Sequence, residues 1–197
     1  MDLLIATNNQ GKINEFAPLL GGLPLALRDL SYFAIQDQVE ETGATFAENA
    51  AIKASTYANL ARAHALADDS GLMIDSLNGE PGVKSARYAG EGATDLDRIE
   101  KVLSKLGHAD DRAARFVCVV ALADATGNVL HSETGICEGT IALSPRGENG
   151  FGYDPIFVPK GFDLTFGELA IDVKQKISHR AIAISKIIPF LQGFFKI

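Results

Sequence analysis

Residues 3–12 read Leu3-Leu4-Ile5-Ala6-Thr7-Asn8-Asn9-Gln10-Gly11-Lys12, a short apolar run that passes directly into polar turn residues. A continuous apolar run of this length is typical of a buried strand, and the Asn and Gly residues that follow it indicate a turn. Ile13, Phe16, Leu19 and Leu20 then recur at helical spacing. Because α/β proteins usually begin with a strand, a polar turn and a helix, the stretch predicts that fold class.

The rest of the chain mixes predicted helices and strands. Residues 45–65 are rich in Ala and contain neither Gly nor Pro, and Thr45 with Glu48 fits a capping box, so the longest helix is expected there. Further helices are expected over 94–106, with Thr94 as N-cap, and over 176–191. Strands are expected over 64–67 and 72–74 around an acidic turn, over 115–123 and 128–130 as a hairpin, and over 136–143, followed by a structured loop over 144–159. This order predicts a mixed α/β sheet flanked by helices, not a purely parallel one, in one domain over residues 1–197.

Composition excludes several classes of protein. The chain is 47% hydrophobic and 22% charged, with a net charge of −7. A broad nucleic-acid surface needs an excess of Lys and Arg, so no nucleic-acid partner is expected, whereas a local cluster of cations can still bind one phosphate ligand. The first residues carry an acid where a signal peptide is basic, and the apolar run is too short to cross a bilayer, so no membrane contact and a cytoplasmic location are expected. Cys118 and Cys137 lie in apolar surroundings and are expected to be buried and reduced.

The turn from Thr7 to Lys12 is a candidate phosphate site. It lies between a predicted strand and a predicted helix, where unpaired N–H groups and the helix dipole favour an anion. Thr7 and Asn9 add side-chain donors and Lys12 adds a cation. An ordinary strand-to-helix turn with an exposed lysine explains the same residues, because the glycines of a Walker motif are absent.

Two acidic pairs could hold a metal ion. Mg²⁺ prefers carboxylate oxygens and is often bound by one or two protein acids together with substrate phosphates. Asp68-Asp69 follows an apolar run, so at least one of these carboxylates is expected near the core with a partner or a metal. Glu40-Glu41 precedes a helix start, where acids are also common for capping reasons.

Two further clusters could hold a base. Phe151-Gly152-Tyr153-Asp154 places an aromatic ring and an acid in a Gly-rich loop, which suits stacking on a base and hydrogen bonding to its edge, although a rigid turn has the same composition. Lys174, His179 and Arg180 crowd potential cations at the start of the last helix, where acids are usual. A ligand with an anionic or carbonyl group would explain why cations stand where acids are usual, and so would a solvent-exposed basic face.

Taken in order, these pieces resemble the inosine triphosphate pyrophosphatase family, whose members remove non-canonical purine nucleoside triphosphates. The resemblance covers almost the whole chain, and each piece is weak alone but the ordered set is specific. Its pieces are Thr7 to Lys12, Glu40-Glu41-Thr42-Gly43, Thr45-Phe46 with Glu48-Asn49-Ala50, Asp68-Asp69-Ser70-Gly71-Leu72, Pro81-Gly82 with Ser85-Ala86-Arg87-Tyr88, Phe151-Gly152-Tyr153-Asp154-Pro155 and Ser178-His179-Arg180. Val173 and Gly167 depart from residues that are frequent in the family, without removing a site residue.

The resemblance implies an elongated mixed α/β fold with two lobes, a substrate cleft between them, and a homodimer. It implies Mg²⁺-dependent cleavage of ITP, dITP or XTP to the monophosphate and pyrophosphate, with Mn²⁺ as a possible substitute. Asp69 would be the general base and a metal ligand, with Glu40 or Glu41 as further ligands. Substrate contacts would come from the following residues: Thr7, Asn8, Asn9, Gln10, Gly11, Lys12 and Lys174 at the phosphates, Ser70, and Phe151, Gly152, Tyr153, Asp154, His179 and Arg180 at the base.

Base selection follows from hydrogen-bond chemistry. Inosine and xanthine carry a 6-keto acceptor that suits donors on His179 and Arg180. Adenine presents an amine at this position, so both donors would stay buried without an acceptor and adenine would bind more weakly. Two alternatives stay open: a pyrophosphatase of the septum-inhibitor family acting on dTTP or UTP, and a non-catalytic nucleotide-binding regulator. The ordered motifs count against the first, and the intact Asp69 and Lys12 count against the second.

Overall fold

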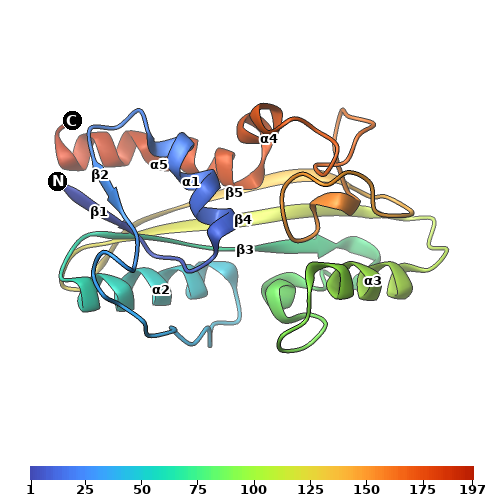
Figure 1. Cartoon of the computed structure of the whole chain (residues 1–197), viewed down its shortest axis with the longest axis horizontal. Helices are drawn as coiled ribbons and strands as arrows, with labels where there is room; N and C mark the ends of the chain where they lie inside the picture. The colour runs from blue at the N-terminus through green and yellow to red at the C-terminus, as the bar shows by residue number, and fades with distance from the viewer. The chain divides into compact units, whose positions relative to one another are not determined.

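A computed structural model describes residues 1–197. Its strands and helices follow one another along the chain in this order: β1 Asp2–Ile5, α1 Gln10–Leu20, β2 Ala26–Arg28, α2 Phe46–Ala61, β3 Ala65–Ile74, α3 Asp95–Leu106, β4 Ala113–Ala123, β5 Val129–Ile141, β6 Phe157–Pro159, α4 Ile171–Ile177 and α5 His179–Phe195 (Figure 1). Short 3₁₀ turns occupy residues 75–77, 82–87 and 154–156.

The strands form one six-stranded sheet in the order β2-β1-β3-β4-β5-β6. β1 is parallel to both β2 and β3, whereas β5 is antiparallel to β6. The expected mixed α/β sheet with flanking helices is therefore confirmed. β2 and β6 were missed because each has only three residues, too few to show an alternating pattern.

Local signals placed the helix starts well. Thr45 caps α2 and Thr94 caps α3, and each helix has a capping box, closed by Glu48 and by Asp97 respectively. The closing helix differs from the expected 176–191, because the chain breaks at Ser178 in extended conformation and separates α4 from α5.

Two of the expected strand breaks are absent. β3 runs without interruption from Ala65 to Ile74, so the predicted acidic turn at Asp68-Asp69 is wrong. The strand continues because both acids have cationic partners and can be buried without leaving it. β5 likewise runs from Val129 to Ile141 as one strand, since the polar residues in its middle alternate between exposed and half-buried positions.

The chain divides into two compact units. The first comprises residues 1–69, 118–135 and 180–197, and the second comprises residues 70–117 and 136–179. Within the first unit, α1 and α5 cover one face of the strands and α2 covers the other (Figure 1). The core under α1 and α5 includes Leu3, Leu66, Val120 and Ile187.

The second unit has its own core. It is built from α3 with Ile99 and Val102, from the strand residue Phe116, and from Phe157 and Phe166. Three of these aromatic rings pack together, with centroids 4.6 Å apart for Phe116 and Phe157 and 5.4 Å apart for Phe157 and Phe166. Each unit thus buries an apolar cluster large enough to fix the side chains around it.

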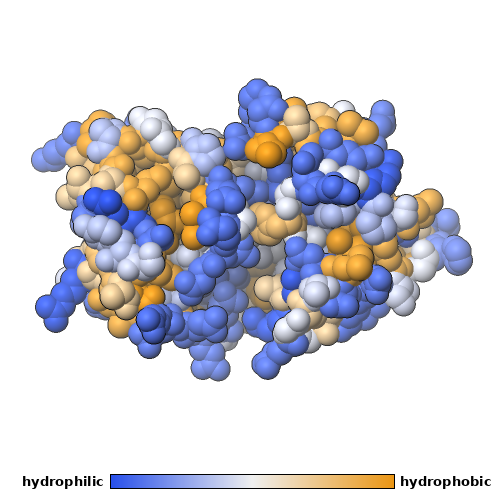
Figure 2. Space-filling model, in the orientation of Figure 1, coloured by the Kyte–Doolittle hydropathy of each residue, from blue (hydrophilic) through white to orange (hydrophobic).

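The surface is mixed in polarity. On the face that Figure 2 shows, hydrophilic residues are interspersed with smaller apolar areas. None of the helices is both long and apolar enough to cross a membrane. Cys118 and Cys137 are buried and not bonded to each other, which confirms the expectation of reduced thiols. Burial raises the pKa of the Cys137 thiol to about 12.

Candidate active site

The candidate phosphate turn begins where β1 ends. Leu4 and Ile5 pair with Ala65 and Leu66, so β1 stops at Ile5 while the parallel strand β3 continues toward Asp68 and Asp69. The turn therefore lies beside the acidic part of β3. The carboxyl ends of parallel strands that feed helix N-termini are a common place for ligands in α/β sheets.

Side-chain caps hold this turn in shape. The Asn9 side chain accepts a hydrogen bond from the Lys12 backbone N–H at 3.0 Å and so caps α1. Thr7 Oγ1 in turn accepts from the Asn9 N–H at 3.2 Å. Asn8, Asn9 and Gln10 are exposed to solvent. Helix α1 begins at Gln10, so Gln10 and Gly11 already belong to its first turn. The turn thus presents a capped helix N-terminus, which favours an anion.

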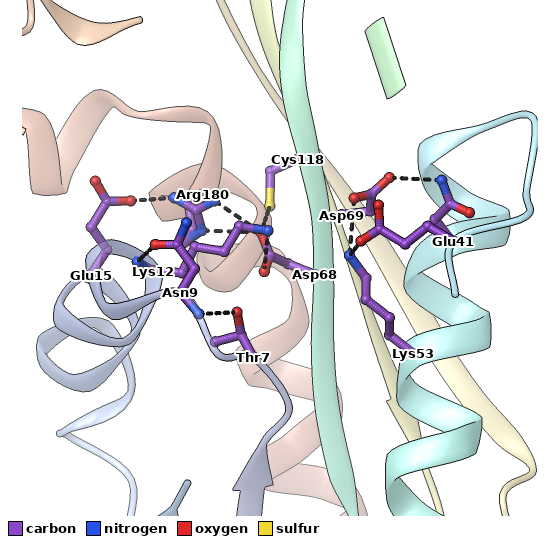
Figure 3. Close-up of polar contacts among 11 residues, drawn as sticks. Thr7, Asn9, Lys12, Glu15, Glu41, Lys53, Asp68, Asp69, Cys118 and Arg180 are labelled. Atoms are coloured by element: carbon purple, nitrogen blue, oxygen red, sulfur yellow. Dashed lines mark hydrogen bonds and ion pairs between the residues drawn. The ribbon is translucent and has the colours of Figure 1, made fainter. Parts of the chain in front are cut away.

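Asp68 lies on the α1 and α5 side of β3 (Figure 3). It is 1% exposed, and its Oδ1 lies 3.0 Å from Lys12 Nζ. This contact is an ion pair without hydrogen-bond geometry at Oδ1. Oδ2 accepts hydrogen bonds from Arg180 Nη2 at 2.9 Å and Nε at 3.3 Å, and Arg180 Nη1 also pairs with Glu15. Asp68 therefore ties the first turn of α1 to the first turn of α5.

Asp69 points to the opposite side of β3, toward α2 (Figure 3). It is 5% exposed, and Lys53 Nζ lies 3.0 Å from its Oδ1. The same ammonium contacts Glu41 Oε1 at 2.6 Å. Asn49 Nδ2 donates to Asp69 Oδ2 at 3.2 Å. One lysine thus joins two of the predicted metal-site carboxylates.

The two aspartates differ electrostatically. Burial alone would raise the pKa of Asp68, but the charges of Lys12, Arg180 and Lys53 outweigh it and lower that pKa below the ordinary range. For Asp69, burial dominates and its pKa is raised, because Glu41 partly offsets the effect of Lys53. Burial would lower the pKa of Lys53, but Asp68 and Asp69 raise it, so the ammonium stays charged. Asp69 is accordingly the better proton acceptor of the pair.

The carboxylates of Glu41 and Asp69 fit a hard divalent cation. Both are oxygen donors held near each other by Lys53, and their mutual repulsion is part of what raises the pKa of Asp69. No group of three or more His, Cys, Asp or Glu side chains is arranged as a metal cage. A Mg²⁺ ion that takes one or two protein carboxylates and completes its shell with phosphate oxygens and water does not need one. Glu40 is exposed, so Glu41 is the better-placed ligand.

Sequence reasoning missed Lys53, and it gave Asn49 no role although Asn49 belongs to one of the motifs that carry the resemblance. Both lie on the buried face of α2, with Lys53 9% and Asn49 0% exposed. Their spacing of four residues, continued by the buried Tyr57, was the available signal. Asn49 and Lys53 each directly precede a small buried residue of the row Ala50, Ala54 and Ala58, so they lie on the same face of the helix. Polar side chains on a buried face need hydrogen-bond or ion-pair partners in the interior.

In the second unit, the loop from Phe151 to Asp154 is built around a carboxylate. Asp154 Oδ2 accepts from the Phe151 N–H at 2.8 Å and also pairs with Lys174 Nζ. The loop passes so close that a Cβ at Gly150, where φ is +78°, would lie 1.9 Å from Asp154 Oδ2. Lys174 Nζ lies 5.0 Å from the centroid of the Phe151 ring. Lys174 therefore lies with the predicted base residues.

The other predicted base residues are also fixed in place. The Tyr153 hydroxyl donates to the Ser85 carbonyl at 2.9 Å, and the Gly152 N–H donates to Asp95 Oδ2 at 2.7 Å. His179 is 5% exposed and stacks on Phe116, with ring centroids 4.7 Å apart and planes 12° apart. Ser70 follows Asp69 on β3. Arg180 is 1% exposed within its ion pairs, so its contact with a base stays a prediction.

Comparison with known proteins identifies the family. The protein-family model that is described as the Ham1 family matches residues 3–190 of this chain. The chain belongs to the Ham1 family. The resemblance inferred from the ordered motifs is thereby confirmed.

Several Ham1-family relatives match nearly the whole chain. The dITP/XTP pyrophosphatase of Prochlorococcus marinus is 50% identical over 190 residues, which cover 96% of this chain and 92% of that protein. The dITP/XTP pyrophosphatase of Bacillus subtilis is 47% identical over 194 residues and covers 98% of both chains. The structure of the Staphylococcus aureus Ham1 protein is 44% identical, with a TM-score of 0.88, over 98% of this chain and 99% of that one.

Proposed function

We propose that this chain is a nucleoside triphosphate pyrophosphatase that hydrolyses dITP, XTP and ITP to the monophosphate and pyrophosphate. Relatives 47–50% identical over almost the whole chain are named dITP/XTP pyrophosphatases. The observation that carries the chemistry is the buried Asp69 carboxylate, held by Lys53 next to Glu41. Such a group suits proton abstraction from water in a reaction that needs no covalent intermediate.

In this proposal Asp69 takes a proton from the water that attacks the triphosphate, and the bond between the α- and β-phosphates breaks. Its raised pKa favours proton uptake. Lys53 keeps the Asp69 and Glu41 carboxylates in place. Glu41 and Asp69 would hold Mg²⁺, which when bound neutralises phosphate charge and polarises the phosphoryl oxygens.

The remaining roles divide by cluster. The capped turn Thr7 to Lys12 binds phosphate through backbone N–H groups and the Lys12 ammonium. Phe151 stacks on the base, and Lys174 and His179 supply donors to a 6-keto group. We assign Lys174 to the base because its ammonium contacts Asp154 and the Phe151 ring, which revises the phosphate role expected from the sequence. The enzyme removes altered purines from the nucleotide pool and acts as a homodimer.

A substrate panel tests this function. ITP, dITP, XTP, ATP, GTP, dTTP and UTP are incubated with the protein and Mg²⁺, and pyrophosphate and orthophosphate are measured separately. We expect pyrophosphate from the 6-keto, non-canonical purines and none in excess EDTA. Preferred hydrolysis of dTTP or UTP would favour a septum-inhibitor activity, and binding without turnover would favour a regulator.

A further inference from the structure

Asn49 is a fully buried amide on α2 that contacts Asp69 and the loop that carries Glu41. Its Nδ2 donates to Asp69 Oδ2 at 3.2 Å, and its Oδ1 accepts from the Gly43 N–H at 2.8 Å. The residue is 0% exposed. Asn is a poor choice for a helix interior on propensity alone, so its presence there needs another reason.

The Gly43 contact fixes which way the amide points. A backbone N–H can only donate, so the group facing Gly43 must be the amide oxygen. The NH₂ group is then directed at Asp69 Oδ2. An aspartate at position 49 could still accept from Gly43, but it would bring an oxygen without a proton to the Asp69 carboxylate. The donor, and not only the shape, is therefore what position 49 supplies.

α2 contacts both oxygens of Asp69. Asn49 donates to Oδ2, and Lys53, one turn later, contacts Oδ1 at 3.0 Å. A carboxylate with one contact can rotate about its Cβ–Cγ bond, whereas two contacts from one rigid helix define its plane. Lys53 alone cannot do this, because it also contacts Glu41.

The loop that carries Glu41 is fastened by the same amide. Gly43 approaches α2 so closely that a Cβ there would lie 2.6 Å from Glu48 Cβ and 2.7 Å from Asn49 Oδ1. Only glycine allows this approach without displacement of the helix or the loop. Asn49 thus links the Glu41 loop to Asp69, since only Thr42 lies between Gly43 and Glu41.

We propose that Asn49 is a positioning residue, which orients the Asp69 carboxylate and holds the Glu41 loop in register with it. This inference rests on the proposed function, in which Asp69 is the general base. A base displaced by about 1 Å can lose about 10²-fold in rate. Loss of the Asn49 donor should therefore lower kcat while leaving substrate binding largely intact.

The test compares Asn49→Asp with Glu48→Gln. Asn49→Asp keeps the acceptor for Gly43 and loses the donor to Asp69. Glu48 is a matched control, because it accepts from the Ala44 and Thr45 N–H groups of the same loop but does not contact Asp69. We expect kcat for ITP to fall by about 10- to 100-fold in Asn49→Asp with little change in KM. Glu48→Gln should lower Tm and leave kcat unchanged.

Asn49→Leu is the second variant, because its side chain has the same branching and number of non-hydrogen atoms and adds no charge beside Asp69. It should show the same fall in kcat, and thermal unfolding shows whether each variant is folded. A folded Asn49→Leu with wild-type kcat and only a lower Tm overturns the proposal, since a purely structural role predicts that result.

The Asp69→Asn background separates this proposal from the proposed function. If Asn49 acts through Asp69, Asn49→Asp, which keeps the acceptor for Gly43, should cause no further loss in the residual rate of Asp69→Asn. An equal additional loss in that background overturns the positioning role while leaving Asp69 as the base. Normal turnover by Asp69→Asn alone would instead overturn the base assignment, and the positioning role with it.

Discussion

Asp68 and Asp69 are consecutive residues of β3 whose carboxylates lie on opposite sides of the sheet and contact different cations (Figure 3). Asp68 contacts Lys12 and Arg180, whereas Asp69 contacts Lys53. Alternation along a strand produces this arrangement directly, because successive side chains point to opposite faces. Two acids that look equivalent in the sequence therefore have different chemistry, one permanently paired and one suited to accept a proton.

The first prediction concerns catalysis. Asp69→Asn should lower kcat for ITP by about 10²- to 10⁴-fold, because the amide keeps the shape of the side chain but cannot accept the proton. Pyrophosphate release is measured under saturating Mg²⁺, and circular dichroism checks the fold. A near-normal kcat would move the base to another residue.

The second prediction concerns stability, and its sign differs between the two acids. The folded-state pKa of Asp68 is lowered, so its ionised form stabilises the fold above the ordinary aspartate pKa and this stabilisation is lost as the pH falls below that value. Asp68→Asn should lower the free energy of unfolding at pH 7 by about 3–5 kcal/mol, because Lys12 and Arg180 lose a buried partner. The difference from wild type should shrink below about pH 4.

Asp69 should behave in the opposite way. Its folded-state pKa is raised, so the ionised form is disfavoured by folding at neutral pH and this penalty disappears as the pH falls toward the ordinary aspartate range. Asp69→Asn should be at least as stable as wild type at pH 7, and the difference in the free energy of unfolding between them should shrink as the pH falls. Urea unfolding of wild type and both variants from about pH 2 to pH 7 checks both signs, because the Asp68 difference should shrink only below about pH 4. Equal destabilisation by the two substitutions would contradict the assignment.

Much of this fold follows from local sequence signals. The apolar run at residues 3–6, the capping boxes at Thr45 and Thr94, and the change of pattern between helices and strands all predicted elements that the structure contains. The uninterrupted course of β3 could not be predicted, because Asp68 and Asp69 are typical turn residues in isolation. Their cationic partners come from residues 12, 53 and 180, so only the folded chain shows that the acids can be buried.

The candidate site shows the same limit. The acids and the phosphate turn carry recognisable local patterns, and they could be selected from the sequence. Lys53 and Asn49 lie in an Ala-rich helix, where a single lysine suggests a solvent-exposed position. Only their place on the face of α2 that carries the buried alanines indicates that they are buried. The phosphate role of Lys174 was implied by the family resemblance, and its contact with Asp154 becomes visible only in three dimensions.

The third prediction concerns the metal. Glu41→Gln should raise the Mg²⁺ concentration needed for half-maximal activity by about tenfold or more, because it removes one of two candidate carboxylate ligands. Calorimetric titration of the protein with Mn²⁺ gives an independent affinity. Glu40→Gln is the comparison, since Glu40 is exposed and should change both values little. A larger effect from Glu40 would reverse the assignment.

The fourth prediction separates phosphate binding from base selection by comparing two lysines. Lys12 lies at the capped turn and is assigned to phosphate, which ITP and ATP share. Lys12→Met should therefore lower kcat/KM for ITP and ATP by similar factors. Lys174 contacts Asp154 and lies over the Phe151 ring, so its ammonium is assigned to the base.

Lys174→Met should lower kcat/KM for ITP about tenfold or more while changing that for ATP much less. A hydrogen bond from a charged donor contributes about 1.5–3 kcal/mol, and the 6-amino group of adenine cannot accept one. The ITP/ATP ratio of kcat/KM should thus fall in Lys174→Met and stay constant in Lys12→Met. Lys174→Arg keeps the positive charge beside Asp154 and controls for disruption of the loop. Equal losses for ITP and ATP in Lys174→Met would return Lys174 to the phosphate role that the family resemblance implied.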